Sequence, residues 1–479
     1  MTQASQWLQH EDFETRSAQP SKRLSFLKFL VRYPIILLAF GPPIFRESSA
    51  NPGLDSSQAH FDIWNVLQVG LLCLIAARAI VRLGVVRSVL IPKQVQSVLK
   101  WALFLGLLFL LSLVYSPGRV ITAEFTVLYF LTWICVVEFI VDAYLNPPNW
   151  MQCLFALRRI AIVLLALVVL CLPVNPGFVM NVVPGAGIRL MGGSVAAMGI
   201  ICPLIAIISA YSFLYSLESR VRSTVLFLVS IAGLAVTQVR GAELSLILVL
   251  AVLGMGWAKA SKRSTYVFIS VSIAFILLAG VAVTAIGAGR IWNTFNRGQD
   301  TEGILSASGR TGVWADVIRY TVDHPQGMGY IAGIRANRIS TNSDTSMHVV
   351  LNRIGGTDNA YMQTLADAGW LSLALYLVLL AKIAALGWRF AFKRASSASL
   401  PNSVPRHALR CALCLFLLCL VEAMESSGFV LPLRQEFYFQ NIIIAIILGA
   451  STSMMIANPV SARSLGRETS WRRSSWPIV

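Results

Sequence analysis

Long apolar runs separated by short polar segments extend along most of the chain. They fall near residues 26–46, 63–81, 101–117, 121–144, 158–174, 194–216, 223–239, 241–258, 264–287, 369–388, 409–427 and 437–457. Most have roughly the 17–25 residues that an α-helix needs to cross a bilayer, where each backbone hydrogen bond must be satisfied within the protein. The pattern therefore predicts an all-α, polytopic integral membrane protein with about 12 transmembrane helices.

Two places in this pattern are less regular than the rest. Lys28, Arg32 and Pro34 interrupt the first apolar run, which makes it the weakest predicted helix. Only a short break around Arg240 separates the seventh run from the eighth. Because this break is so short, a single helix in place of two is the alternative.

The runs and the polar stretches between them divide the chain into five segments. These are an N-terminal cytoplasmic tail at 1–25, nine helices within 26–287, a large extracytoplasmic loop at 288–368, three helices within 369–457 and a basic cytoplasmic tail at 458–479. Polar residues also precede the first apolar run, without the early apolar region and small-residue cleavage site of a signal peptide. We therefore expect the first run to stay in the mature protein.

The large loop contains two predicted helices. The first covers Ser308–Asp323, with Ser308 as its N-cap. Its apolar stripe is formed by Val313, Trp314, Val317 and Ile318. The second helix begins at Asp358 and is predicted to run through Gly369 into the tenth membrane helix. Between them, the segment from Arg335 to Ser346 is rich in Ser, Thr and Asn.

The basic residues predict the orientation of the chain. Every second short loop carries Lys or Arg, and such loops prefer the cytoplasmic side. Both termini are therefore predicted to be cytoplasmic and the large loop periplasmic, in a bacterial inner membrane. The loops on the opposite side contain Arg but no Lys. Because the planar guanidinium binds phosphate oxygens bidentately, some of these arginines are candidates for phosphate recognition, although translocated loops could also simply tolerate Arg.

Composition supports a membrane protein and excludes several other classes. Hydrophobic residues make up 56% of the chain and charged residues 13%, with a mean hydropathy of +0.69. The net charge of +17 lies mainly in short loops, so no nucleic-acid partner is predicted. The eight cysteines lie in or beside apolar runs, which argues against a disulfide framework. Cys411 and Cys414 have no His or second cysteine pair nearby, so we predict no metal and no cofactor.

Two short patterns on the predicted periplasmic side could carry chemistry. Arg240-Gly241-Ala242-Glu243 lies at the membrane edge, where an unpaired charge is costly. An ion pair between Arg240 and Glu243 within one helical turn is the structural alternative. Ser308-Gly309-Arg310 opens the first loop helix, where an anion would meet a guanidinium and free backbone N–H groups. Arg240 and Arg310 are therefore candidates for binding a negatively charged substrate.

Two further patterns are weaker when taken alone. Asp358-Asn359 opens the second loop helix, and an Asp at such a position is usually only an N-cap. Arg189-Leu190-Met191-Gly192-Gly193 precedes the sixth predicted membrane helix. Neither pattern indicates a particular reaction by itself.

Taken in order, these segments resemble the O-antigen ligase and polymerase family of bacterial cell-surface glycan assembly. That family typically has Arg-Gly after the seventh helix, then Gly-Arg, Trp, His-Pro and Gly-x-Gly in the loop, and a polar residue with Asn, a Leu-rich turn and Gly before the tenth helix. This chain has Arg240-Gly241, Gly309-Arg310, Trp314, His324-Pro325, Gly327-Met328-Gly329, Asp358-Asn359, Leu365 and Gly369. The resemblance extends from about Arg189 through Leu375.

The resemblance implies a glycosyltransferase of type C architecture that works without a metal. Its donor would be a glycan on an undecaprenyl-pyrophosphate carrier, and its acceptor a glycan or the lipid A-core, with membrane lipid and other polysaccharide assembly proteins as further partners. Arg240 and Arg310 would stabilise the negative charge that grows on the leaving pyrophosphate. Arg189, Asn359 and Arg319 are candidate substrate-binding residues.

The candidate base departs from the family pattern. Ligases usually have His immediately before the Asn, whereas this chain has Asp358. A carboxylate can accept a proton, but a helix N-terminus stabilises its ionised form and weakens it as a base, so Asp358 could instead only orient the acceptor. His348 is the fallback base, and His324 reads as a turn residue held by Pro325. The departure favours an O-antigen or exopolysaccharide polymerase slightly over a lipopolysaccharide ligase.

Carboxylates within the membrane also need partners. Glu422 and Glu425 lie three residues apart near the outer end of the eleventh run, hence on one helix face. They are candidates for substrate binding, with a structural ion pair as the alternative. Glu138 and Asp142 lie near the inner end of the fourth run, too far from the loop to contact the substrate directly.

Two other functions remain open from the sequence. A transporter or flippase of a lipid-linked sugar would suit twelve helices, but such proteins usually contain internal repeats, and the two halves of this chain show no clear repeat. A protein-glycosylating transferase of similar architecture is the second alternative.

Overall fold

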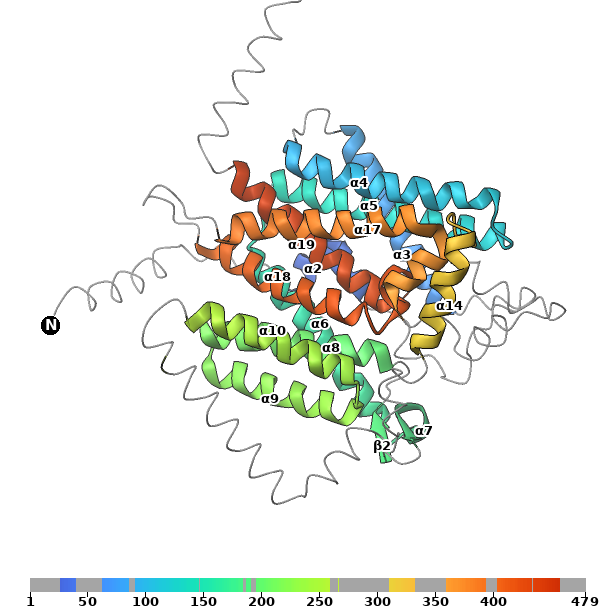
Figure 1. Ribbon diagram of the computed structural model, residues 1–479. Coiled ribbons are helices and arrows are strands. Elements are labelled where there is room, and N and C mark those ends of the chain that lie inside the picture. The colour runs from blue at the N-terminus through green and yellow to red at the C-terminus, as the bar shows by residue number, and fades with distance from the viewer. Residues whose placement is uncertain are drawn as a thin grey trace, which may run out of the picture.

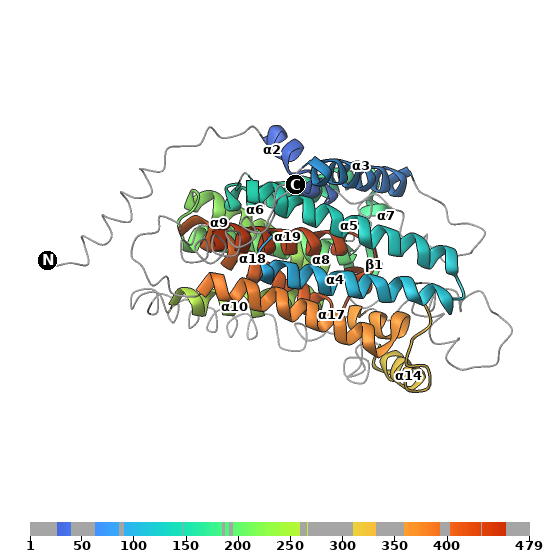
Figure 2. The same ribbon diagram turned by 90° about the horizontal axis from the view of Figure 1, so that it is seen from above.

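The computed structural model describes residues 26–39, 63–85, 91–145, 147–183, 187–190, 195–258, 266, 310–331, 359–392, 403–432 and 434–456. Most of these residues form a bundle of long helices that run along a common direction (Figures 1 and 2). The long helices are α3 (Ile63–Val85), α4 (Lys93–Leu111), α5 (Arg119–Leu145), α6 (Trp150–Cys171), α8 (Val195–Leu214), α9 (Arg220–Thr237), α10 (Arg240–Ala258), α17 (Ala360–Phe392), α18 (Ser403–Glu422) and α19 (Gln435–Ile456).

Nine helices in the described part of the chain are long and apolar enough to cross a membrane. The tenth long helix, α18, is more polar, since it contains Arg406, Arg410 and Glu422. α8 and α19 are the most deeply buried of the nine, whereas α9 exposes most of its surface. The prediction of a polytopic helical membrane protein is confirmed, while the ninth predicted helix, at 264–287, lies outside the described residues.

The prediction of a first membrane helix at 26–46 is wrong for residues 26–39, which are the ones that the structure describes. Phe26–Arg32 forms the short helix α2, and Pro34–Ala39 forms the 3₁₀ helix η1. Pro34 lacks a backbone N–H and its ring obstructs the preceding turn, so α2 ends before it. The buried side chains of η1 pack against the bundle instead of forming a membrane-spanning helix.

The boundary around Arg240 is resolved in favour of two helices. α9 ends at Thr237, and Gln238 adopts a left-handed conformation with φ of 53°. Its backbone N–H still bonds to Leu234 O, which closes the last turn of α9. α10 then begins at Arg240, so the arginine stands at the first position of a helix.

The all-α prediction misses one small hairpin. After the short helix α7 (Pro176–Val179), strands β1 (Met180–Val183) and β2 (Gly187–Leu190) pair antiparallel, with Asn181 opposite Arg189. The hairpin and α7 lie at one end of the bundle, next to the ends of the helices (Figure 1).

The helix that begins the tenth predicted span is broken where the sequence predicted continuity. α17 covers Ala360–Phe392, but Gly369 has φ of 79° and ψ of −177°, which no helix contains. The short N-terminal piece before Gly369 meets α14 (Arg310–Asp323), which stands across the end of the bundle (Figure 1). Glycine is needed here because other residues rarely adopt this backbone conformation.

The end of the bundle opposite to α14 is held by ion pairs. Arg82 Nη1 lies 3.2 Å from Glu138 Oε1 and 3.0 Å from Asp142 Oδ1, and Arg78 Nε lies 3.1 Å from Glu138 Oε1. Arg78 also donates to backbone carbonyls of the α2 segment, at Val31 and Arg32. Glu138 and Asp142 therefore join α3 and α5 at the opposite end of the bundle from α14 (Figure 1).

Candidate active site

Asn359 caps the N-terminus of α17. Its Oδ1 accepts hydrogen bonds from the backbone N–H groups of Tyr361, at 2.9 Å, and Met362, at 3.0 Å. These are two of the four N–H groups that a helix leaves without internal partners, and Asn is among the best residues for bonding them. Its Nδ2 donates to Met424 O at 3.0 Å, so the same side chain ties α17 to the segment after α18.

Further hydrogen bonds fix this junction. The backbone N–H of Ala360 donates to Ala423 O at 2.7 Å, and the hydroxyl of Tyr361 donates to Leu420 O at 2.9 Å. The N-terminus of α17 is therefore attached to the C-terminal end of α18 at three points. Positive charge at a helix N-terminus meets negative charge at a helix C-terminus, so the two dipoles also favour the contact.

The end of α18 also reaches α10. The carboxylate of Glu425 lies directly against Gly241, so close that a side-chain carbon at position 241 would overlap it. Glu425 and Glu243 are both electrostatic neighbours of the Arg240 guanidinium. The glycine of the Arg-Gly pair thus has a physical role, because it leaves room for a carboxylate beside the arginine.

Glu422 lies deeper, one helical turn before Glu425. Its side chain is buried between α18, α8 and α10, near Gly199 and Ser245, and it is only 4% exposed. Oε1 of Glu422 accepts no hydrogen bond from the residues that the structure describes. A buried carboxylate oxygen of this kind is a strong acceptor for an incoming donor group.

The turn after α14 is joined to the break in α17 through backbone atoms. Met328 N donates to Ala366 O at 2.8 Å, and Gly329 N donates to Asp367 O at 2.7 Å. In return, Trp370 N donates to Pro325 O at 3.2 Å. The turn and the break therefore form one structural unit.

Two glycines make this close approach possible. Gly327 and Gly369 both have positive φ, and a side-chain carbon on either one would overlap backbone atoms of the other segment. The Gly-x-Gly pattern and the later glycine, far apart in the sequence, thus serve the same contact.

Tyr330 anchors the end of this turn in the bundle. Its backbone N–H donates to Ser112 Oγ at 3.0 Å, its hydroxyl donates to Val430 O at 3.0 Å, and its ring stacks on Phe109 with centroids 3.8 Å apart. Thr122 Oγ1 donates to the carbonyl of Tyr330 at 2.9 Å. Burial raises the pKa of Tyr330 well above its ordinary value, so the hydroxyl remains a neutral hydrogen-bond donor.

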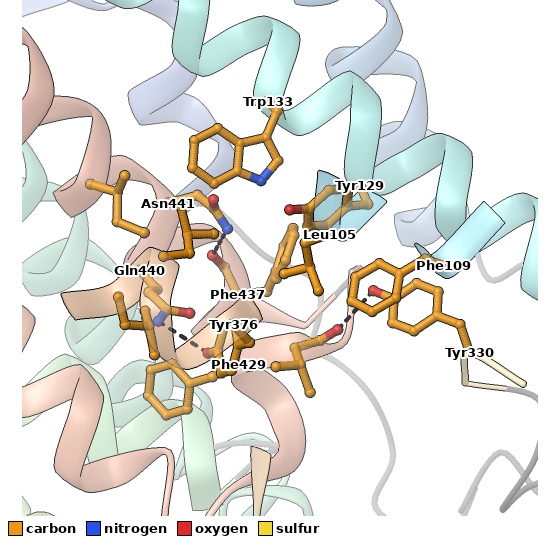
Figure 3. Close-up of a pocket in the computed structure, with 14 residues that line it drawn as sticks. Leu105, Phe109, Tyr129, Trp133, Tyr330, Tyr376, Phe429, Phe437, Gln440 and Asn441 are labelled. Atoms are coloured by element: carbon orange, nitrogen blue, oxygen red, sulfur yellow. Dashed lines mark hydrogen bonds between the residues drawn. The ribbon is translucent and has the colours of Figure 1, made fainter. Parts of the chain in front are cut away.

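An aromatic cavity lies beneath Tyr330, between α4, α5, α17 and α19. It is small, with a volume of about 30 Å³, which leaves room for about one water molecule. Half of its lining residues are aromatic, namely Phe109, Tyr129, Trp133, Tyr330, Tyr376, Phe429 and Phe437 (Figure 3). Its polar groups are largely paired with one another, since Gln440 Nε2 donates to the Tyr376 hydroxyl at 3.4 Å and Asn441 Nδ2 to Phe437 O at 2.8 Å. The cavity therefore offers mainly apolar surface.

Comparison with known families connects these elements. Residues 225–377 match a family described as O-Antigen ligase. This segment, about a third of the chain, is similar to that family. The resemblance found in the sequence is thereby confirmed, and the matched segment runs from α9 into α17 and includes Arg240, α14 and Asn359. No curated protein matches the chain.

The structure brings four of the predicted site residues together at one junction in and beside the matched segment. Arg240 from α10, Asn359 from α17, and Glu422 and Glu425 from the end of α18 meet there. Glu422 and Glu425 lie outside the matched segment, after residue 377. The C-terminal part of the chain therefore completes this junction.

The other predicted residues lie elsewhere or outside the described part. Arg310 begins α14, and Arg319 further along α14 has an 81% exposed side chain whose Nη1 lies 3.5 Å from Asp316 Oδ1. Arg189 lies in β2, where only its backbone is described. Asp358, His348 and Ser308 are outside the described residues.

α14 packs on the first turns of α17 by a narrower apolar face than the sequence predicted. Val313 and Val317 are buried against Leu365 and Ala366, as expected, whereas Ile318 is exposed. Ile318 follows Val317 directly, and the next position on a helix turns by about 100°, away from the contact.

The structural interpretation of His324 fits its surroundings. Its ring is exposed and stacks on Tyr320 with centroids 4.3 Å apart, and its Nδ1 lies 3.3 Å from Tyr320 O. These contacts close the end of α14 before Pro325. Tyr330 and the contact between Gly241 and Glu425 were missed from the sequence, and the only signals were an aromatic residue after Gly-x-Gly and a glycine after Arg240.

Proposed function

We propose that the protein is a membrane glycosyltransferase that moves a glycan from an undecaprenyl-pyrophosphate carrier to the hydroxyl of an acceptor sugar. The observation that carries the proposal is the junction of α10, α17 and α18, within and beside the segment that matches the O-antigen ligase family. A guanidinium, an amide and two carboxylates converge there, at one end of an apolar helix bundle. This position suits a substrate with a polar glycan and a long hydrocarbon chain.

The reaction creates negative charge on the leaving pyrophosphate as the glycosidic bond breaks. Arg310 at the first position of α14 would meet this charge together with the N–H groups of the first helical turn. Arg240 at the first position of α10 would do the same at the junction. Interactions that strengthen as charge develops stabilise the transition state more than the ground state.

Polymerase activity is the slightly preferred form of the reaction. Asp358 stands where O-antigen ligases usually have His, and a polymerase with a different acceptor accommodates that change more readily. The acceptor would then be a growing glycan rather than the lipid A-core.

Purified protein in detergent tests the transfer reaction. We expect it to join glycans from a polyprenyl-pyrophosphate donor to an acceptor. Because detergent solution contains no membrane to cross, transport alone could not give this product. Arg310→Ala should lower kcat by about 100–1,000-fold, as is typical for the loss of one charge-stabilising donor. The kcat of Arg310→Lys should lie between those of Arg310→Ala and the wild type, because lysine keeps the charge but lacks the planar guanidinium that bonds two phosphate oxygens. Absence of transfer by the wild-type protein, with flipping of the lipid-linked glycan in vesicles, would instead establish a transporter.

Polymerase and ligase are distinguished by what accumulates in cells that lack the protein. Carrier lipid bearing single repeat units is expected for a polymerase. Carrier lipid bearing finished polymer would show that the protein is a ligase.

A further inference from the structure

The junction of α10, α17 and α18 contains more negative than positive charge. Arg240 carries the positive charge, and Glu243 and Glu425 are its electrostatic neighbours. Glu422 is in turn a neighbour of Glu425. The side of Arg240 that faces Glu243 and Glu425 is therefore unfavourable for a phosphate, whereas a sugar hydroxyl would find hydrogen-bond acceptors there. The carboxylates therefore fit the acceptor better than the donor.

Glu425 is both accessible and firmly placed. Its side chain is exposed, yet its carboxylate lies against Gly241 at the start of α10. The backbone N–H groups of Glu425 and Ser426 both donate to Glu422 O, at 2.9 Å, which closes the turn that carries it. The adjacent Met424 and Ala423 carbonyls are the ones bonded to Asn359 and Ala360. A hydroxyl can thus reach an exposed carboxylate that extends from a turn held by α17 and α18 and rests against the start of α10.

Glu422 supplies a second, independent observation. It is 4% exposed, and its Oε1 accepts no hydrogen bond from the described residues. A buried carboxylate oxygen without a donor costs free energy, which a hydroxyl group from a substrate would recover. The geometry therefore provides one accessible and one buried carboxylate at the same point.

We propose that Glu425 and Glu422 form the acceptor site, in which Glu425 takes the proton of the attacking sugar hydroxyl and Glu422 accepts a hydrogen bond from the acceptor. This inference rests on the proposed function. Both residues follow the matched family segment, so the acceptor site is assembled from the C-terminal part of the chain.

The step balances without any further reagent. The acceptor O–H bond breaks, and its proton passes to the Glu425 carboxylate. The acceptor oxygen forms a bond to the anomeric carbon of the donor while the bond from that carbon to the phosphate oxygen breaks, and the electron pair leaves on the pyrophosphate.

Arg240 has a matching role between the two substrates. A guanidinium has five N–H donors in one plane, so one edge can hold Glu425 while another faces a phosphate oxygen. The acceptor oxygen and the leaving phosphate would then be aligned on two sides of a single side chain.

Alanine replacement with chemical rescue tests the proton transfer. Glu425→Ala should lower kcat by about 100-fold or more, the usual contribution of a general base, with the KM for the donor within about twofold of wild type. Sodium formate should restore part of the activity of Glu425→Ala, because formate can enter the space left by the carboxylate. Glu425→Gln should be equally slow and should not respond, because its amide fills that space.

Asp323→Asn is the matched control, since it removes an exposed carboxylate at the end of α14 that lies outside the junction. It should transfer at the wild-type rate, and all variants should be monodisperse in detergent with similar melting temperatures. If Glu425→Ala does not fold, the transfer rate of Glu425→Gln shows whether the carboxylate is needed, because glutamine has nearly the same shape as glutamate.

The outcomes separate the two proposals. Failure of the wild-type protein to transfer glycan overturns the proposed function. If the wild-type protein transfers glycan and both Glu425→Ala and Glu425→Gln retain more than a tenth of its activity, only the proposed acceptor site is overturned. Loss of activity without rescue by formate overturns proton transfer by Glu425.

Discussion

The carboxylate of Glu425 occupies the space into which a side chain at position 241 would extend, so Gly241 and Glu425 can meet only because residue 241 is glycine. The contact joins the start of α10 to the end of α18 and places a carboxylate beside Arg240. An Arg-Gly pair is a weak signal in a sequence. In this fold the arginine provides a positive charge, and the glycine leaves space for the carboxylate that lies beside it.

Gly241→Ala should therefore lower the rate of glycan transfer while leaving the free energy of unfolding nearly unchanged. The overlapping atoms are the tip of a flexible side chain, so Glu425 can move aside and the free energy of unfolding should change by no more than about 1 kcal/mol. The displaced carboxylate should lower glycan transfer by about 10–100-fold, since small misplacements at a reacting centre are costly.

Gly256→Ala is the matched control on the same helix, because a side-chain carbon there meets no atom within 4 Å. It should leave transfer unchanged and stabilise α10 by up to about 1 kcal/mol, as alanine favours a helix over glycine. Equal transfer rates in Gly241→Ala and Gly256→Ala would show that the position of Glu425 does not matter.

Gly369→Ala should have the opposite profile, with a large loss of stability. A side-chain carbon at Gly369 would overlap the carbonyl oxygen of Pro325, and its φ of 79° is unfavourable for alanine. Neither the backbone nor the turn can move without breaking the bonds between Met328 and Ala366. We expect a loss of about 3 kcal/mol or more, measured by unfolding in mixed detergent micelles.

The comparison variant is Gly312→Ala on α14, where a side-chain carbon meets nothing within 4 Å. It should be neutral or slightly stabilising. A small effect of Gly369→Ala would mean that the turn after α14 is not held against the break in α17.

Most of the bundle was predictable because apolar run length is a local property. The runs that became α5, α6 and α8 needed no knowledge of their neighbours, and Gln238 confirmed the break between α9 and α10. At Pro34 the helix stopped, whereas α8 continues through Pro203. The break at Gly369 was not predictable, because it exists for a contact with Pro325 in a distant segment.

The candidate site was predictable as a set of residues but not as an arrangement. Arg240, Asn359, Glu422 and Glu425 were each selected from charge at the membrane edge or from the family pattern. Their meeting depends on hydrogen bonds from Asn359 and Ala360 to the carbonyls after α18, which any residue would offer. Backbone acceptors leave no mark in a sequence, so this junction required the structure.

Tyr330→Phe isolates the hydroxyl that links the turn after α14 to Val430. Phenylalanine keeps the ring stacked on Phe109 and removes only the 3.0 Å hydrogen bond to the Val430 carbonyl. The loss should be about 1–2 kcal/mol, because a buried carbonyl loses its donor. Tyr330→Ala should lose about 3–5 kcal/mol, as is typical when a buried aromatic ring is removed. Similar melting temperatures for both variants would contradict the role of the ring.

Arg82→Met should weaken the end of the bundle that lies opposite to the candidate site. Asp142 is 2% exposed, and Arg82 is the nearer of its two arginine partners, at 3.0 Å against 4.0 Å for Arg32. Leaving a buried carboxylate with a weaker partner costs about 3–5 kcal/mol for a fully buried pair, and we expect about 2 kcal/mol here because Arg82 is 38% exposed. Asp142→Asn in the same chain should recover part of the loss, since the amide carries no charge.

Arg319→Ala, which breaks the exposed pair with Asp316, should change stability by less than about 0.5 kcal/mol. Equal effects of Arg82→Met and Arg319→Ala on unfolding in mixed micelles would show that the ion pairs between α3 and α5 do not stabilise the bundle.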